Sequence, residues 1–234
     1  MFIFKLFVGS CWGSFLTYIA YCFIQQEKIK LRRSHCDFCR QQLRIKDLIP
    51  LFSYLFGRGK CAYCQQPISF SYFLLELSSA LVFLSVKELS VYNILLLTLC
   101  SVLLVLAVVD YQTLHLPQVL LNGCLALAVL FNLSYCNFSW WELLLALLSS
   151  SGLMLAFNLA QKDCFGSGDI KLMAFISLAL GNKTYSAMIL ACLGAGIVAA
   201  IMKYHKNYQG RYLAFAPFLV FGIIIKLLGI VSFV

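Results

Sequence analysis

The chain passes from Leu103-Leu-Val-Leu-Ala-Val-Val109 directly into Asp110, a transition that indicates a membrane segment with a polar group at its boundary. This apolar run closes a window, residues 89–109, that contains no Asp, Glu, Lys or Arg. Four more windows of this kind cover residues 6–26, 111–141, 143–161 and 184–202. Each is long enough to cross about 30 Å of hydrocarbon as a helix, which takes roughly 20 residues.

Composition extends this interpretation to the whole chain. The 234 residues are 62% hydrophobic and only 12% charged, and a water-soluble domain of this size cannot hide that much apolar surface. Three weaker windows cover residues 68–86, 172–182 and 212–232. The sequence therefore predicts an all-α polytopic membrane protein with about eight transmembrane helices, the first of them within residues 1–24.

Basic residues predict the orientation of these helices. Nine of the 18 Lys and Arg residues share one polar insertion after the first helix, namely Lys28, Lys30, Arg32, Arg33, Arg40, Arg44, Lys46, Arg58 and Lys60. Short loops rich in Lys and Arg stay in the cytoplasm. Counting helices onward places Asp110 and the loop before Asp169 on the same side, with both termini outside. The net charge of +9 is explained by this rule, so we expect no nucleic acid as partner.

The polar insertion, residues 25–67, contains Cys36-Asp-Phe-Cys39 and Cys61-Ala-Tyr-Cys64. Two such pairs can supply four thiolates to one tetrahedral Zn²⁺. Disulfides could also form between them, but a cytoplasmic location disfavours disulfides. We expect a structural zinc on Cys36, Cys39, Cys61 and Cys64, because four sulfurs leave no open position for a catalytic water. The insertion would separate the first helix from a membrane core over residues 68–234.

A second aspartate stands at a boundary, in Phe165-Gly-Ser-Gly-Asp169. Each aspartate has a plain structural interpretation: Asp110 as a carboxylate reaching for water at a helix end, and Asp169 as the N-cap of a helix that starts at Ile170. Capping does not explain Gly166 and Gly168, which permit unusual backbone dihedrals or the close approach of a substrate chain.

Taken together, the two aspartates favour hydrolytic chemistry. Ionisable groups at membrane depth are costly and usually functional. Two carboxylates that share one proton can activate a water and protonate a carbonyl oxygen. We expect Asp110 and Asp169 as the catalytic pair, with Gly166, Gly168 and Lys171 beside the substrate. Asp163 is a nearby carboxylate without flanking glycines, and the role of Glu76 stays open.

With these residues in place, the chain resembles the bacterial type IV prepilin peptidases, membrane-embedded aspartyl proteases with a Gly-x-Gly-Asp motif. The resemblance rests on segments that keep the family's order and spacing: Gly9-Ser-Cys-Trp-Gly-Ser-Phe-Leu16, Arg33-Ser-His-Cys36, Leu48-Ile-Pro50, Ser53-Tyr-Leu55, Gly59-Lys-Cys61, Glu76-Leu77, Asp110 and Phe165-Gly-Ser-Gly-Asp-Ile-Lys-Leu172. It implies a protein of the bacterial cytoplasmic (inner) membrane whose active site faces the cytoplasm. The implied substrates are the leaders of prepilin or pseudopilin precursors, with a competence pseudopilus as one setting.

Many members of that family also methylate the new N-terminus with S-adenosylmethionine. This chain departs from their pattern, with Thr17 where Asn is common and Tyr21-Cys-Phe23 near the place of an Arg-Leu-Pro segment. Methyltransferase activity therefore stays open. The residues are also compatible with a non-catalytic membrane assembly protein that has a zinc docking module, with a presenilin-type intramembrane protease, and with a transporter that relays protons through the carboxylates.

Overall fold

The computed structural model of the chain describes residues 2–29, 33–36, 38–86, 88, 90–136, 139–160, 166–204 and 213–228. Every named element in these ranges is a helix, and strand-like pairing is limited to two isolated bridges, His35 with Gln42 and Lys60 with Pro67. The predicted all-α class is therefore confirmed for the described ranges. By their internal contacts the residues form two units, Met1–Lys87 and Glu88–Val234.

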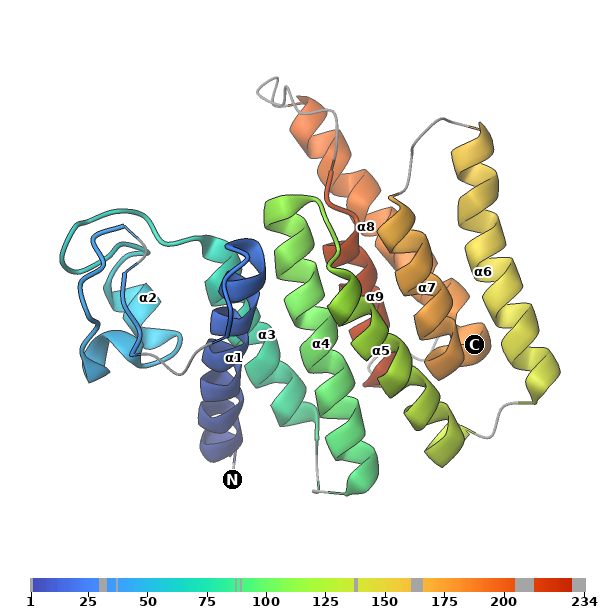
Figure 1. The fold of residues 1–234 in the computed structure, drawn as a ribbon, viewed down its shortest axis with the longest axis horizontal. Helices are drawn as coiled ribbons and strands as arrows, with labels where there is room; N and C mark the ends of the chain where they lie inside the picture. Colours follow the sequence, from blue (N-terminus) through green and yellow to red (C-terminus); the bar gives the residue numbers. More distant parts are fainter. Residues whose placement is uncertain are drawn as a thin grey trace. The chain divides into compact units, whose positions relative to one another are not determined.

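The first unit is built on two packed helices, α1 (Phe2–Ile24) and α3 (Phe70–Ser85) (Figure 1). Glycines on α1 let the two backbones touch: a Cβ added at Gly13 would stand 2.7 Å from the Cα of Glu76, and one at Gly9 would stand 2.8 Å from the Cα of Ala80. The Ser79 hydroxyl donates to the Gly9 carbonyl at 2.9 Å. Small residues thus bring the helices together in the way that transmembrane pairs commonly use.

The polar insertion between α1 and α3 contains a 3₁₀ turn, η1 (Ile45–Leu48), and a short helix, α2 (Phe52–Phe56). The ring of Tyr54 stacks on that of Phe73 with 5.0 Å between centroids. The backbone N–H of Leu51 donates to Glu76 Oε2 at 2.8 Å. These contacts hold α2 against the first two turns of α3.

The described part of the second unit contains six longer helices. They are α4 (Val91–Thr113), α5 (Gln118–Phe131), α6 (Trp140–Ala160), α7 (Ser167–Leu180), α8 (Thr184–Tyr204) and α9 (Ala216–Leu227). A π-helical turn, η2 (Asn132–Cys136), follows α5, and a 3₁₀ turn, η3 (Gly181–Lys183), links α7 to α8. Helix α4 packs against α5 and α9, while α7 packs against α5 and α6 and α9 against α8 (Figure 1).

Helix α4 forms the core of this unit. Leu99, Cys100, Leu103 and Leu106 have no exposed surface, and they follow the helical spacing of one continuous buried face. The apolar run that precedes Asp110 is therefore buried among other helices. Asp110 is buried with it, whereas the three residues that end α4 after it are exposed.

Three described helices are long and apolar enough to cross a membrane: α1, α4 and α8. Three shorter apolar helices are Phe70–Ser85, Gln118–Ser134 and Ala216–Leu227. Helix α7 differs from the predicted segment 172–182, because it begins at Ser167 and has 14 residues, about 21 Å of helix. The expected boundaries near residues 24 and 67 stay a prediction, since the division by contacts falls after Lys87.

Candidate active site and metal centre

A cavity of about 180 Å³ lies in the second unit, where the end of α4 meets the starts of α5 and α7. Its lining combines carboxylates, a lysine and backbone from the glycine motif: Asp110, Leu114, His115, Leu116, Gln118, Leu121, Gly166, Ser167, Gly168, Asp169 and Lys171. Residues of two segments far apart in sequence thus share one polar cavity, which contains both aspartates that the sequence singled out.

Asp110 lies in the last turn of α4 and is only 6% exposed. Its Oδ2 accepts a hydrogen bond of 3.2 Å from the backbone N–H of Ala216, the first residue of α9. The helix continues to Thr113 and ends where Leu114 takes left-handed dihedrals and donates its N–H to the Asp110 carbonyl at 2.8 Å. Asp110 therefore lies at a helix end, as the plain structural interpretation expects, but its side chain faces the cavity and not bulk solvent.

Asp169 lies inside the first turn of α7, where its N–H donates to the Gly166 carbonyl at 3.1 Å. The N-cap residue is Gly166, so the prediction of Asp169 as N-cap is wrong by one helical turn. The side chain is 8% exposed, and its buried Oδ1 has no hydrogen-bond partner among the described residues. A buried acceptor of this kind costs free energy unless a proton, a water or a ligand satisfies it.

The expectation of unusual dihedrals at the two glycines is wrong, whereas the close approach of a substrate chain stays a prediction. Gly166 has φ −65° and ψ 148°, and Gly59 and Gly181 are the glycines with positive φ among the described residues. A Cβ added at Gly168 would stand 2.9 Å from Leu116 Cδ1. At Gly166 an added Cβ would stand 3.3 Å from Asp169 Oδ2.

Polar side chains stand at the exposed side of the cavity. Lys171 Nζ donates to Gln118 Oε1 at 3.4 Å, and His115 is exposed in the link between α4 and α5. Gln118 and Leu116 also line the cavity but were not predicted from the sequence, because neither residue type indicates a site. Asp163 and Phe165 lie outside the described residues.

The first unit holds a separate cluster of four cysteines. The sulfurs of Cys36, Cys39, Cys61 and Cys64 all lie within 4.8 Å of one another, and those of Cys36 and Cys64 are 3.8 Å apart. A tetrahedral zinc with Zn–S bonds of about 2.3 Å requires sulfurs about 3.8 Å apart. The predicted gathering of the four cysteines is confirmed, and the donor set fits a metal such as zinc.

The two Cys-x-x-Cys segments repeat one backbone design. Arg40 and Gln65, which follow the second cysteine of each pair, take φ of 55° and 60°. Their N–H groups donate to the carbonyls of Cys36 and Cys61 at 2.9 and 3.0 Å. In this turn, backbone N–H groups point at the sulfurs. The N–H groups of Cys64 and Tyr63 lower the pKa of the Cys61 thiol to about 7. Burial raises the pKa of the Cys36 thiol to about 11.

Glu76 joins the cysteine-bearing insertion to α3. Leu51, whose N–H binds Glu76 Oε2, has φ 63° and ψ −50°, and the N–H of Phe52 donates to the Pro50 carbonyl at 2.7 Å. These values describe a γ-turn of the rare, strained kind. The carboxylate of Glu76 therefore accepts a hydrogen bond from the insertion within the first unit, and its role in the site stays open.

Comparison with known proteins finds a matching family model in each unit. Residues 7–88 match the bacterial peptidase A24 N-terminal domain, and residues 97–202 match the type IV leader peptidase family. A prepilin leader peptidase/N-methyltransferase of Pectobacterium carotovorum subsp. carotovorum is 36% identical over 81% of this chain and 71% of its own length. One of Bacillus subtilis (strain 168) is 31% identical over 100% of this chain and 96% of its own length.

A third relative is named a type 4 prepilin-like proteins leader peptide-processing enzyme, from Escherichia coli O78:H11. It is 31% identical over 76% of this chain and 70% of its own length. No solved structure matches the chain.

Proposed function

The chain belongs to the type IV leader peptidase family, and we propose that it is an aspartyl endopeptidase that removes the N-terminal leader of type IV prepilin or pseudopilin precursors. One observation carries the proposal: Asp110 and Asp169 are both buried and line the same cavity. Two carboxylates in one enclosed polar site are the equipment of aspartyl proteases, whose pair holds a single proton because like charges at short range oppose a second ionisation.

In this mechanism the ionised carboxylate takes a proton from a water, and the water oxygen forms a bond to the scissile carbonyl carbon. The protonated carboxylate donates to the carbonyl oxygen. The C–N bond then breaks as the leaving amine takes up a proton. The N–H of Ala216 supports the orientation of Asp110, and the unpartnered Oδ1 of Asp169 is the atom free to hold the water or the substrate. The pair titrates as a unit.

The substrate leader enters beside the glycine motif in this proposal. Gly166, at the start of α7, is exposed and lines the cavity, so an extended chain can approach its backbone and pair with main-chain groups, as in strand addition. Lys171 stands at the exposed side of the same cavity. Gly168 supports leader binding indirectly, because it lets Leu116 pack directly against the start of α7.

The four cysteines hold a structural Zn²⁺ in this proposal. Their sulfur spacing fits a tetrahedral site, and four thiolates leave no open position for a substrate. When bound, the metal supplies folding free energy to an insertion whose described part has little apolar core of its own. It takes no part in the hydrolysis.

The membrane arrangement is also part of the proposal. Eight helices (α1 and α3–α9) cross the bacterial cytoplasmic membrane, and the basic insertion and both aspartates face the cytoplasm. The helix lengths of α1, α4 and α8 support three of these crossings directly. The shorter helices require a locally thinner bilayer or flanking side chains that extend to the headgroups. Leader peptides lie on the cytoplasmic side under this arrangement, where the cavity would receive them.

A second activity, methyl transfer from S-adenosylmethionine to the new N-terminal amine, is favoured by the name that the relatives carry, prepilin leader peptidase/N-methyltransferase. Thr17, which stands where many family members have Asn, donates its hydroxyl to the Gly13 carbonyl within α1 at 3.0 Å. Incubating membranes with methyl-labelled S-adenosylmethionine and a precursor tests this activity. Label in the mature N-terminal peptide supports it, and cleavage without label argues against it.

Cleavage of a prepilin-type precursor by membranes containing wild type, Asp110→Asn or Asp169→Asn tests the protease. Asparagine keeps the shape and removes the titratable group, so each change should reduce the rate by about 100-fold or more. Zinc content should stay at the wild-type level. A wild-type rate in either variant would exclude a catalytic role for that aspartate. Asp163→Asn would then be tested before the alternative of a non-catalytic assembly protein, which needs its zinc module and not the aspartates.

A further inference from the structure

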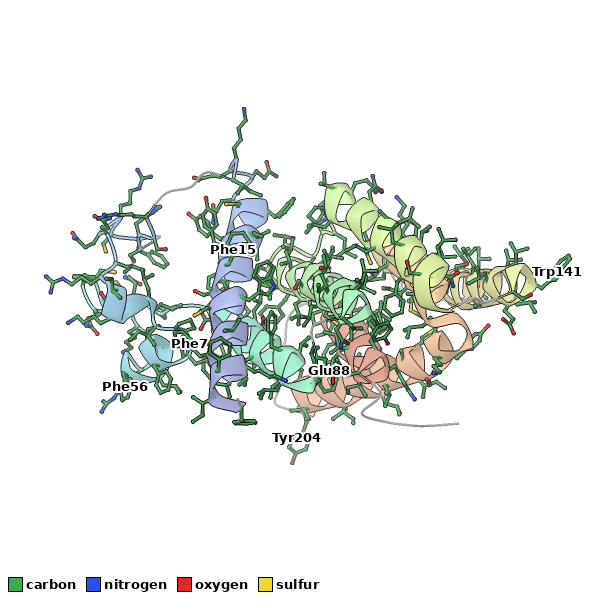
Figure 2. The ribbon with its side chains drawn as sticks, turned by 90° about the horizontal axis from the view of Figure 1, so that it is seen from below. Phe7, Phe15, Phe56, Glu88, Trp141 and Tyr204 are labelled. Carbon is green, nitrogen blue, oxygen red and sulfur yellow. The ribbon has the colours of Figure 1, made fainter. Side chains whose placement is uncertain are left out.

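The insertion of the first unit carries an apolar surface that leader cleavage does not use. Six side chains between 37% and 86% exposed form this surface, which we call the η1–α2 face: Ile45, Leu48, Ile49, Phe52, Leu55 and Phe56. Ile45 and Phe56, at 86% and 84%, are almost fully exposed. Figure 2 shows Phe56 projecting away from α1. Within this set the rings of Phe52 and Phe56 stack with 6.1 Å between centroids. Exposed apolar side chains that gather in this way mark contacts with a membrane or another protein.

The opposite side of α2 is committed to the helix pair. Leu51 is 9% exposed, and its N–H is bound to Glu76 Oε2. Tyr54 stacks on Phe73 of α3 with 5.0 Å between ring centroids. The segment is therefore held on α3 by one side and presents the η1–α2 face outward from the other.

These contacts also set the level of the face along α3. The helix has 16 residues, about 24 Å of length, and Glu76 lies about 9 Å along it from Phe70 at 1.5 Å per residue. A helix this short needs its whole length to cross the hydrocarbon. With α3 crossing the membrane as proposed above, the face would lie near the boundary between headgroups and acyl chains, where interfacial helices bury their apolar side by about 5–10 Å.

The charges around the face suit an anionic surface. Arg44, Lys46, Arg58 and Lys60 flank it and are all exposed. The one acidic residue between them, Asp47, accepts hydrogen bonds from the Tyr63 hydroxyl at 2.9 Å and the Arg44 N–H at 3.1 Å. Basic residues beside an amphipathic segment attract anionic lipid headgroups.

We propose that the η1–α2 face is an interfacial anchor that inserts Ile45, Phe52, Leu55 and Phe56 into an anionic bilayer and so fixes the cysteine cluster at the membrane surface. Basic side chains and apolar tips together make a membrane a better occupant than an apolar polypeptide. This inference concerns the first unit and does not depend on the aspartates.

Fluorescence quenching by lipid tests the anchor. The full chain, zinc-loaded, is placed in nanodiscs of phosphatidylcholine and phosphatidylglycerol with or without brominated acyl chains. Phe56→Trp is compared with wild type, so that the emission of the three native tryptophans is subtracted. Gln42→Trp is the matched control, because Gln42 is an exposed residue of the same insertion outside the face. Leu55→Trp gives a second position on the face, and zinc content verifies the fold of each variant.

We expect the added emission of Phe56→Trp and Leu55→Trp to be blue-shifted and to fall by about half in brominated lipid, while that of Gln42→Trp changes little. Red-shifted, unquenched emission at both face positions would overturn the anchor in favour of a water-exposed surface. Blue-shifted but unquenched emission would overturn it in favour of a face covered by protein. Equal quenching of Gln42→Trp would also overturn it, because the whole insertion would then lie in lipid.

Lipid composition gives an independent readout. Replacing phosphatidylglycerol by phosphatidylcholine should reduce the quenching of Phe56→Trp, and Lys46→Gln with Arg58→Gln should reduce it in the same direction in anionic discs. If neither the lipid replacement nor the two substitutions changes the quenching, the proposed attraction of the face to anionic headgroups is contradicted.

Discussion

Gly168 of α7 lies directly against Leu116 of the link between α4 and α5. A Cβ at position 168 would stand 2.9 Å from Leu116 Cδ1 and 3.0 Å from Leu116 Cβ. Since Asp169 follows Gly168 and Asp110 lies in the last turn of α4, this contact joins the segments that carry the two aspartates. The absence of a side chain at 168 therefore allows α7 to pack closely against the link that follows Asp110.

Gly168→Ala should lower the rate of leader cleavage. The added methyl would stand 3.0 Å from Leu116 Cβ, so α7 or the link must shift by a few tenths of an ångström, and misplacing a reacting group lowers the rate. The measurement is the initial rate of precursor cleavage in membranes at matched expression. Gly123→Ala is the control, because a Cβ at Gly123 of α5 meets nothing within 4 Å.

Rescue distinguishes this contact from a general loss of fold. Leu116→Ala removes Cδ1 and Cγ, which the added methyl would meet at 2.9 and 3.3 Å, and keeps Cβ at 3.0 Å. Gly168→Ala with Leu116→Ala should therefore recover part of the cleavage rate that Gly168→Ala alone loses. A double variant as slow as the single one would contradict the packing explanation and would favour direct contact between Gly168 and substrate.

Cys39→Ser should remove the metal and unfold the insertion while leaving the helices of the second unit intact. Structural zinc supplies roughly 10–16 kcal/mol in small zinc modules, and the described part of the insertion has few other buried contacts. Metal content by mass spectrometry and limited proteolysis within residues 25–67 measure the change. Cys192→Ser is the control, since Cys192 is exposed on α8. Full zinc content in Cys39→Ser would exclude Cys39 as a ligand.

Arg40→Gly should make the insertion more resistant to chelators. Arg40 has φ 55°, and this left-handed conformation costs a residue other than glycine about 1–2 kcal/mol. Glycine avoids that cost, but its greater freedom in the unfolded chain offsets part of the gain. Arg40→Val should do the opposite, because a β-branched residue fits this conformation least. The rate of zinc release in the presence of a chelator is the measurement, and it should be slowest in Arg40→Gly, intermediate in wild type and fastest in Arg40→Val. The reverse order would mean that the Arg40 side chain itself stabilises the insertion.

Glu76→Leu should destabilise the first unit by about 1–3 kcal/mol, the cost of leaving a buried donor unsatisfied. The donor is the N–H of Leu51, which Glu76 Oε2 accepts at 2.8 Å. Glu76→Gln keeps an acceptor oxygen and should lose much less. Hydrogen exchange at the Leu51 amide reports the contact directly, with Glu142→Gln as a variant in the other unit. Slow exchange in Glu76→Leu would show that Glu76 is not what protects this amide.

Several features of the site could be predicted from residue type and spacing. The Cys-x-x-Cys pairs indicated a metal cluster, because four thiolates at that spacing have few other uses, and their sulfurs do come together. Asp110 and Asp169 stood out because carboxylates are rare in an apolar chain. The roles of Gly166, Gly168 and Lys171 toward a substrate stay predictions. The N-cap role for Asp169 failed because α7 begins at Ser167, and polar residues in a first turn obscure where a helix starts.

By itself the sequence determined the helical membrane class, the cysteine cluster and the two aspartates, since hydrophobic windows, ligand spacing and rare charges are properties of the chain read in order. Only the tertiary structure decided that Leu116 packs on Gly168, that Ala216 donates to Asp110 and that Glu76 holds Leu51. Each of these contacts uses a backbone group or the absence of a side chain. Such groups are common to all positions, so they become specific only when packed helices bring distant residues within contact distance.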